Sequence, residues 1–315
     1  MDKKLLSVVG ALLATLGIFA LVVWRVEATI GKDYQLGTTI PNRFWAVGIG
    51  MVIVLMVYLF TREEYSWELG VREAAYMFMG VAMYAAFSGL LNIPAFSFPA
   101  ISQVALRPTI VVPMFFGFVF GPMVGFVTGA VGNLFGDALT GYGLSPQWSI
   151  GNGLIGFITG LAFLFKDEKK TTNTVIAVSG VLTLLSAILF FFNQNLPNKT
   201  YFDASSNVFG DSQISFFAGI SILIGFILIL IVRFGFAQYE NVVLAITWGM
   251  LGNIIGIGFA ALSDIFINGY KLPEAIVGEF LPAAGPNLIF TAILLPLLII
   301  IYQLTTSQNQ PMVKE

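Results

Sequence analysis

Long apolar stretches alternate with short polar ones along almost the whole chain. A helix that crosses a bilayer needs roughly 20 mostly apolar residues. By that criterion the sequence predicts ten membrane helices, at 5–24, 44–61, 73–92, 107–121, 122–140, 148–165, 174–192, 215–233, 241–267 and 286–304. The first stretch has a cleaved signal peptide as its alternative. We expect an uncleaved helix, because the apolar run is long and no small-residue cleavage site follows it.

The polar segments between these helices predict how the chain is oriented. The clearest loops lie at 62–72, 166–170 and 193–213, and the Gly121-Pro122 pair reads as a tight turn between two helices. Lys and Arg are commoner in one alternating set of loops, with the KDEKK run at 166–170 as its strongest member. Basic loops stay in the cytoplasm. An even number of helices then predicts a multi-pass protein of the cell membrane with both termini cytoplasmic.

Glycines recur at helical spacing in three of the predicted helices. Gly121, Gly125, Gly129, Gly132 and Gly136 fall within an arc of about 80° at 100° per residue. Similar small-residue faces occur in 148–165 and 241–267. Small residues allow helix backbones to approach closely in lipid. The pattern therefore predicts a tightly packed bundle.

Polar residues interrupt the apolar helices near one end. A charge at the bilayer centre costs roughly 2.5–3.5 kcal/mol on insertion scales, so such residues are candidates for function. With the predicted orientation, the outer ends of the helices hold Asn92, Arg107, Asn133, Asp137, Asn152, Asp264 and Asn287. Helix caps and snorkelling ends are one explanation. The other is a substrate pocket just below the outer surface.

Aromatic residues near the same end suggest what such a pocket would take. Phe96, Phe98, Tyr142 and Trp148 could stack on a planar ligand, under lids made by the loops 92–108 and 268–286. Each aromatic residue taken alone is also typical of the interfacial belt of a membrane protein.

The amino-acid composition excludes several kinds of catalytic and metal site. The chain is 57% hydrophobic and 10% charged, whereas soluble domains carry about 25% charged residues. It has no Cys and no His, which excludes thiolate chemistry, Cys/His zinc sites and a Ser-His-Asp triad. There is no G-x-x-x-x-G-K-[ST] phosphate loop and no basic patch for nucleic acid. We expect no catalytic residue, no metal, no cofactor and no nucleic-acid partner.

Two segments resemble a known family. ALRPTIVVPMFFGFVFGPMVGFVTGAVGNLFGDALTGYGLSPQWSIGNGLIGFITGL (105–161) resembles the substrate-binding S components of energy-coupling factor (ECF) transporters, particularly the riboflavin-type group. The shared features are Arg-Pro, a short helix, Gly-Pro, a Gly-rich helix that ends in Gly-Asp, a Trp and an Asn-Gly helix start. GPNLIFTAILLPLLIIIY (285–302) resembles the last helix of these proteins.

The resemblance implies an all-α membrane bundle with a six-helix core, an outward-facing pocket for a vitamin-like molecule, and partner subunits. These partners are a transmembrane coupling subunit and two ATPase subunits. The family contacts its coupling subunit through an Ala-x-x-x-Ala pattern, which Ala82 and Ala86 match here. The substrate-binding residues that we select are Phe96, Phe98, Arg107, Asn133, Asp137, Trp148, Asn152, Asp264 and Asn287.

Ten helices exceed a six-helix core by four. Because inserted pairs preserve the direction of all other helices, we divide the chain into an extra hairpin (1–66), core helices one to four (67–170), an inserted hairpin (171–236), core helices five and six (237–305) and a cytoplasmic tail (306–315). The stretch 174–192 could instead be a core helix. Two other functions remain open. One is a stand-alone channel or secondary carrier, and the other is a membrane enzyme or assembly factor that uses Asp137 and Asp264.

Overall fold

The computed structural model describes residues 2–30, 38–63, 67–91, 107–140, 144–164, 168–196, 201–203, 208–210 and 214–308. Within these residues the chain forms ten α-helices: α1 (Lys3–Ile30), α2 (Ile40–Thr61), α3 (Val71–Leu91), α4 (Val111–Phe120), α5 (Pro122–Thr140), α6 (Pro146–Gly160), α7 (Glu168–Phe192), α8 (Phe216–Gly235), α9 (Glu240–Ile267) and α10 (Leu281–Gln308). Each one overlaps a helix expected from the apolar pattern. The predicted all-α membrane architecture is therefore confirmed.

Shorter elements refine that expectation. The 3₁₀ segments η2 (Pro108–Ile110) and η3 (Leu161–Leu164) begin and end apolar stretches, and the π-helix η4 (Glu274–Phe280) leads directly into α10. A small antiparallel pair, β1 (Tyr201–Asp203) and β2 (Val208–Gly210), lies in a segment expected to be loop. The last helix also begins before Pro286, which lies inside α10.

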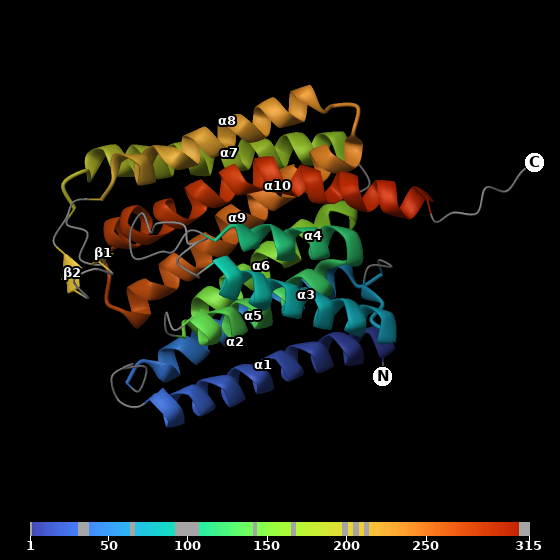
Figure 1. Ribbon diagram of the computed structural model, residues 1–315, viewed down its shortest axis with the longest axis horizontal. Helices are drawn as coiled ribbons and strands as arrows, with labels where there is room; N and C mark the ends of the chain where they lie inside the picture. Colours follow the sequence, from blue (N-terminus) through green and yellow to red (C-terminus); the bar gives the residue numbers. More distant parts are fainter. Residues whose placement is uncertain are drawn as a thin grey trace, which may run out of the picture.

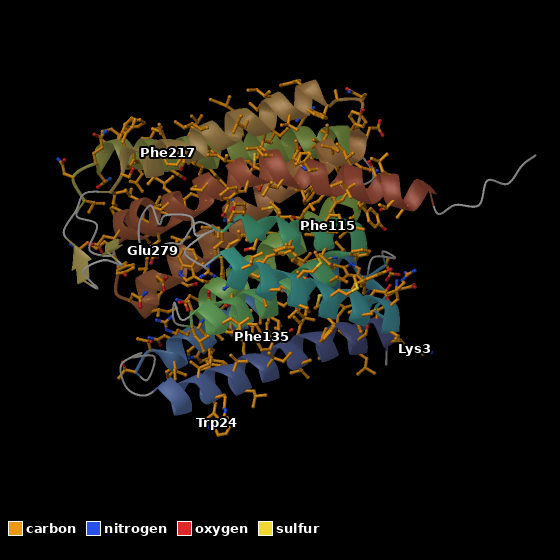
Figure 2. All side chains as sticks on the ribbon, in the orientation of Figure 1. Lys3, Trp24, Phe115, Phe135, Phe217 and Glu279 are labelled. Atoms are coloured by element: carbon orange, nitrogen blue, oxygen red, sulfur yellow. The ribbon has the colours of Figure 1, made fainter. Side chains whose placement is uncertain are left out.

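Among the described residues, seven helices are long and apolar enough to cross a membrane, and a shorter apolar helix covers Pro108–Phe120. Many large apolar side chains on the outer helices face outward; Phe60, Phe192 and Phe234 are 83%, 84% and 74% exposed. Figure 2 shows Trp24 projecting from α1 in the same way. Lipid is the environment that covers such surfaces at no cost.

The bundle is layered (Figure 1). Helices α3 to α6 lie beside α9 and α10, while the α1–α2 hairpin and the α7–α8 hairpin flank them on opposite sides. The start of α1 and the end of α10 lie at the same end of the molecule (Figure 1), which is the arrangement that ten alternating helices predict. Which side of the membrane that end faces stays a prediction, and so does the division of the chain into core and inserted hairpins.

The glycine faces explain the close packing of the centre. A Cβ added to Gly125 would lie 2.6 Å from the carbonyl carbon of Gly156, and one added to Gly151 would lie 2.6 Å from the carbonyl oxygen of Gly256. The backbones of α5, α6 and α9 are therefore in direct contact. Gly121, at the turn between α4 and α5, has a φ of 105°, which a residue with a side chain rarely adopts.

Candidate functional site

A buried ion pair forms the centre of the first polar cluster. Arg107, just before η2, places its Nη1 2.5 Å from Oδ1 of Asp137 on α5. The Arg107 side chain is 20% exposed and that of Asp137 is 5% exposed. The same guanidinium nitrogen donates to Oδ1 of Asn133 at 3.0 Å. Charge-assisted bonds of this kind are among the strong ones in proteins, particularly when partly buried.

Asn133 joins this ion pair to two further helices. Its Nδ2 donates to Oδ2 of Asp137 at 2.9 Å and to Oγ of Ser149 on α6 at 3.0 Å. The hydroxyl of Tyr84 on α3 donates to Oδ1 of Asn133 at 3.1 Å. We call Tyr84, Arg107, Asn133, Asp137 and Ser149 the Arg107 cluster. The cluster pairs one cation with one anion and connects the start of η2 with α3, α5 and α6.

A second cluster surrounds Asp264 near the end of α9. Its Oδ1 accepts from Nε2 of Gln147 and from Nδ2 of Asn268, both at 2.9 Å. Its Oδ2 accepts from the indole Nε1 of Trp148 at 2.7 Å. Arg43 on α2 donates from Nη1 to Oε1 of Gln147 at 3.0 Å.

Glu279 of the π-helix lies next to Asp264 and belongs to this second cluster. Glu279 is 3% exposed and Asp264 is 1% exposed. We call Arg43, Gln147, Trp148, Asp264, Asn268 and Glu279 the Asp264 cluster. Because π-helical turns occur frequently at functional sites, the position of Glu279 adds to the interest of this cluster.

A third, smaller group joins α9 to α10. Asn287 donates from Nδ2 to Oδ1 of Asn253 at 3.0 Å, and Asn253 donates to the backbone carbonyl of Ala284 at 2.9 Å. One turn further along α10, the Thr291 hydroxyl contacts Sδ of Met114 on α4 at 3.3 Å.

The first two clusters share one end of the bundle. They lie where α5 and α9 end and where α2, η2 and α6 begin, which is the end opposite the start of α1 and the end of α10 (Figure 1). The third group lies further toward the middle, since Asn253 is near the midpoint of α9 (Glu240–Ile267). Figure 2 shows Glu279 at this end and Lys3 at the other. The common end expected for the polar residues is therefore observed for Arg107, Asp137 and Asp264, whereas Asn287 lies deeper in the bundle than predicted.

The predicted site residues are distributed over these groups. Arg107, Asn133 and Asp137 hydrogen-bond one another, Trp148 bonds Asp264, and Asn287 bonds Asn253. Asn152 is 7% exposed and lies on α6 one turn after Ser149, against Gly129 of α5. Phe96 and Phe98, together with Tyr142 and Asn92, lie outside the described residues. Binding of a substrate by these residues stays a proposal.

The sequence analysis did not select several polar residues that the structure places in these clusters. Arg43 sits near the start of its helix and looks like an ordinary interfacial residue, while Gln147 and Ser149 lack the charge that attracted attention elsewhere. Glu279 lies in the segment 268–286, which the sequence predicts to be a loop that covers the pocket. The sequence contains a signal for Glu279, because a carboxylate within the apolar run AIVGEFLPAA costs free energy in a membrane unless it is paired.

The two alanines expected to contact a partner lie on a different surface. Ala82 and Ala86 are exposed on α3, one turn apart, and Phe78, Met83 and Phe87 are exposed on the same helix. This face is available to lipid or to another membrane subunit, and the partner contact stays a prediction.

The site residues suit binding better than metal chemistry. Among the described residues, no group of three or more His, Cys, Asp or Glu side chains is placed to hold a metal ion. The end of the bundle that holds the Arg107 and Asp264 clusters instead offers amide donors and acceptors, an indole, an ion pair of one cation and one anion, and the two carboxyl groups of the Asp264 cluster. Such convergent polar groups in an apolar bundle are typical of small-molecule sites.

Comparisons with known proteins point to one family. Residues 68–194 match the family described as ECF-type riboflavin transporter, S component. The match begins after the α1–α2 hairpin and extends through α7. The division of the chain into core helices and inserted hairpins stays a prediction.

Curated relatives match parts of the chain. A UPF0397 protein of Vibrio atlanticus is 35% identical over 81 residues, which is 26% of this chain and 44% of that protein. A UPF0397 protein of Streptococcus pneumoniae serotype 19F is 26% identical over 173 residues, which is 52% of this chain and 91% of that protein. The chain thus spans less than half the length of the Vibrio relative. No solved structure matches the chain.

Proposed function

We propose, from the match of residues 68–194 to the family described as ECF-type riboflavin transporter, S component, that the chain is the high-affinity substrate-capture subunit of an ECF importer for a vitamin or similar small molecule. The observation that carries the proposal is the gathering of buried polar side chains at one end of the bundle, within and beside the matched segment. In this proposal that end faces outward, both termini are cytoplasmic, and substrate binds from outside.

Partner subunits would supply the energy. The sequence has no phosphate loop for ATP, so uphill transport requires a transmembrane coupling subunit and two ATPase subunits. The exposed face of α3 with Ala82 and Ala86 is the proposed contact with the coupling subunit, because small residues at four-residue spacing let two helices approach closely.

The proposed substrate is a riboflavin-type molecule. A flavin ring is planar and carries several ring nitrogens and carbonyl oxygens, which amides, carboxylates and an indole N–H can pair. In this proposal Trp148 and Asn133 exchange their bonds to Asp264 and Asp137 for bonds to the ring, and Asn152 adds a further amide. The selected residues Phe96 and Phe98 would stack on the ring. Riboflavin is therefore the first probe to test.

We expect the purified chain to bind riboflavin with a dissociation constant of roughly nanomolar to micromolar. Asp137→Ala and Asn152→Ala should each weaken binding at least about tenfold, since each removes a buried polar group from the site. The measurement is the change in riboflavin fluorescence on titration with protein. Leu139→Ala is the matched control, because Leu139 is 68% exposed two residues after Asp137, and its affinity should equal that of the unaltered chain.

If both polar variants bind as tightly as the unaltered chain, the site assignment is wrong. If the unaltered chain binds no riboflavin, mass spectrometry of a ligand retained through gentle purification tests the wider vitamin class. A chain that retains no small molecule under either protocol contradicts the capture function.

Transport should depend on the partners. Vesicles that contain this chain alone should show no riboflavin flux, whereas vesicles that also contain the coupling subunit and ATPases should accumulate it only with ATP. Because uptake against a gradient needs an energy source, omission of ATP is the control. ATP-independent flux through the chain alone would instead favour the channel or secondary carrier.

A further inference from the structure

The α1–α2 hairpin precedes the family match at residue 68, yet it reaches the polar end of the bundle. Its contact there is Arg43, near the start of α2. Arg43 donates from Nη1 to Oε1 of Gln147 at 3.0 Å and from Nε to the hydroxyl of Thr39 at 3.0 Å. Both bonds hold the guanidinium in one orientation against α6.

The bond to Gln147 determines how that side chain meets Asp264. A glutamine amide has one acceptor oxygen and one donor nitrogen. With Arg43 bound to the oxygen, the nitrogen points to Oδ1 of Asp264, at 2.9 Å. A reversed amide would place its oxygen against the carboxylate and its nitrogen against the guanidinium, and both contacts would be repulsive. Arg43 therefore fixes Gln147, and Gln147 together with Trp148 fixes Asp264.

Charge gives Arg43 a second effect on the same group. Asp264 and Glu279 are neighbours, and Arg43 lies close enough to interact electrostatically with both of them and with Tyr270. Two buried carboxyl groups side by side repel when ionised, so a neighbouring cation stabilises them. The cation comes from the hairpin, whereas the carboxyl groups come from α9 and the π-helix.

Packing keeps α2 in place for this contact. Gly50, two turns after Arg43 on the same face, lies against Ile150 of α6 and Phe259 of α9, so that a side chain there would collide with Ile150. Asn42 also donates to the backbone carbonyl of Phe266 at 3.5 Å. The first half of α2 is thus docked on α6 and α9.

From this chain of contacts we propose that Arg43 of the N-terminal hairpin is a positioning residue for substrate capture, acting through Gln147 on the Asp264–Trp148 pair. The hairpin is then a working part of the binding end. This inference rests on the proposed function only for its effect on affinity; the effect on Trp148 requires no substrate.

The substrate-free test uses the indole of Trp148 as a reporter. Arg43→Met should shift the intrinsic fluorescence of the full chain in detergent, because it releases Gln147 and alters the hydrogen bond from Trp148 to Asp264. The same substitution in a Trp148→Phe background should produce no shift. Arg43→Lys, which keeps the charge, should restore most of the original spectrum.

The substrate test is a double-mutant cycle with riboflavin as the probe. Arg43→Met should weaken binding about tenfold in the unaltered chain, and Arg43→Lys should recover most of that loss. Arg43→Met should weaken binding little further in an Asp264→Asn background, since the effects of substitutions at residues that act as a unit are not additive. Asn42→Ala, which removes another contact at the same end of α2, is the matched control and should bind normally.

Three results would overturn the proposal: an Arg43→Met shift that persists without Trp148, additive effects of Arg43 and Asp264, or an Asn42→Ala variant as impaired as Arg43→Met. The last would show that docking of the hairpin matters and the arginine does not. If riboflavin does not bind at all, the proposed substrate fails, while the fluorescence comparison still decides the role of Arg43.

Discussion

Arg107→Met should destabilise the protein by about 3–5 kcal/mol and abolish riboflavin binding. The substitution leaves the carboxylate of Asp137 buried, with its side chain 5% exposed, after its 2.5 Å ion-pair partner has gone. Removal of one member of a buried pair costs this much because an uncompensated charge remains in a medium of low dielectric constant. Thermal unfolding in detergent measures the loss of stability, and riboflavin titration below the unfolding temperature measures binding.

A paired substitution separates folding from binding. Arg107→Met combined with Asp137→Leu removes both charges, and replacement of a buried pair by apolar groups is often neutral for stability. We expect the double variant to regain most of the unfolding temperature while binding remains lost. If the double variant binds riboflavin normally, the ion pair serves only the fold. If the single variant is as stable as the unaltered chain, Asp137 is not held by Arg107.

The sequence predicted the helices and the depth of the polar residues because both depend on local spacing. Apolar runs located the ten helices that the structure describes, including short ones such as α4. The i, i+4 spacing of Asn133 and Asp137 placed these residues on one face, where they hydrogen-bond at 2.9 Å. The direction of each helix also placed Asp264 at the end where Asp137 lies. Asn287 lies deeper than predicted, because α10 begins at Leu281 and the π-helix from Glu274 precedes it directly.

Local spacing in the sequence does not predict which residues on different helices contact one another. The contact between Arg43 and Gln147 joins residues 104 positions apart, and the Gln147–Asp264 contact joins residues 117 apart. Such pairs depend on how α2, α6 and α9 are rotated about their axes, and that rotation is set by glycine contacts between backbones. Asp264 and Asp137 looked equivalent in the sequence, but their partners differ.

Those glycine contacts lead to the last expected result. Gly129→Ala should destabilise the protein by about 1–3 kcal/mol, as overpacking of a tight core does, and should weaken riboflavin binding as well. The added Cβ would lie 2.6 Å from the carbonyl carbon of Asn152 and 2.8 Å from the backbone nitrogen of Gly153. Because both atoms belong to backbone, no side chain can rotate away, and α6 must move from α5.

That movement connects packing with the site. Ser149 lies on α6 just before the colliding turn, and its 3.0 Å bond to Asn133 crosses the same interface. Gly89→Ala is the matched control, since Gly89 is on α3 near the same end and an added Cβ would have no neighbour within 4 Å. It should raise stability by up to about 1 kcal/mol, the usual gain of alanine over glycine in a helix. Equal unfolding temperatures for the two variants would show that the α5–α6 contact does not set the geometry of the Arg107 cluster.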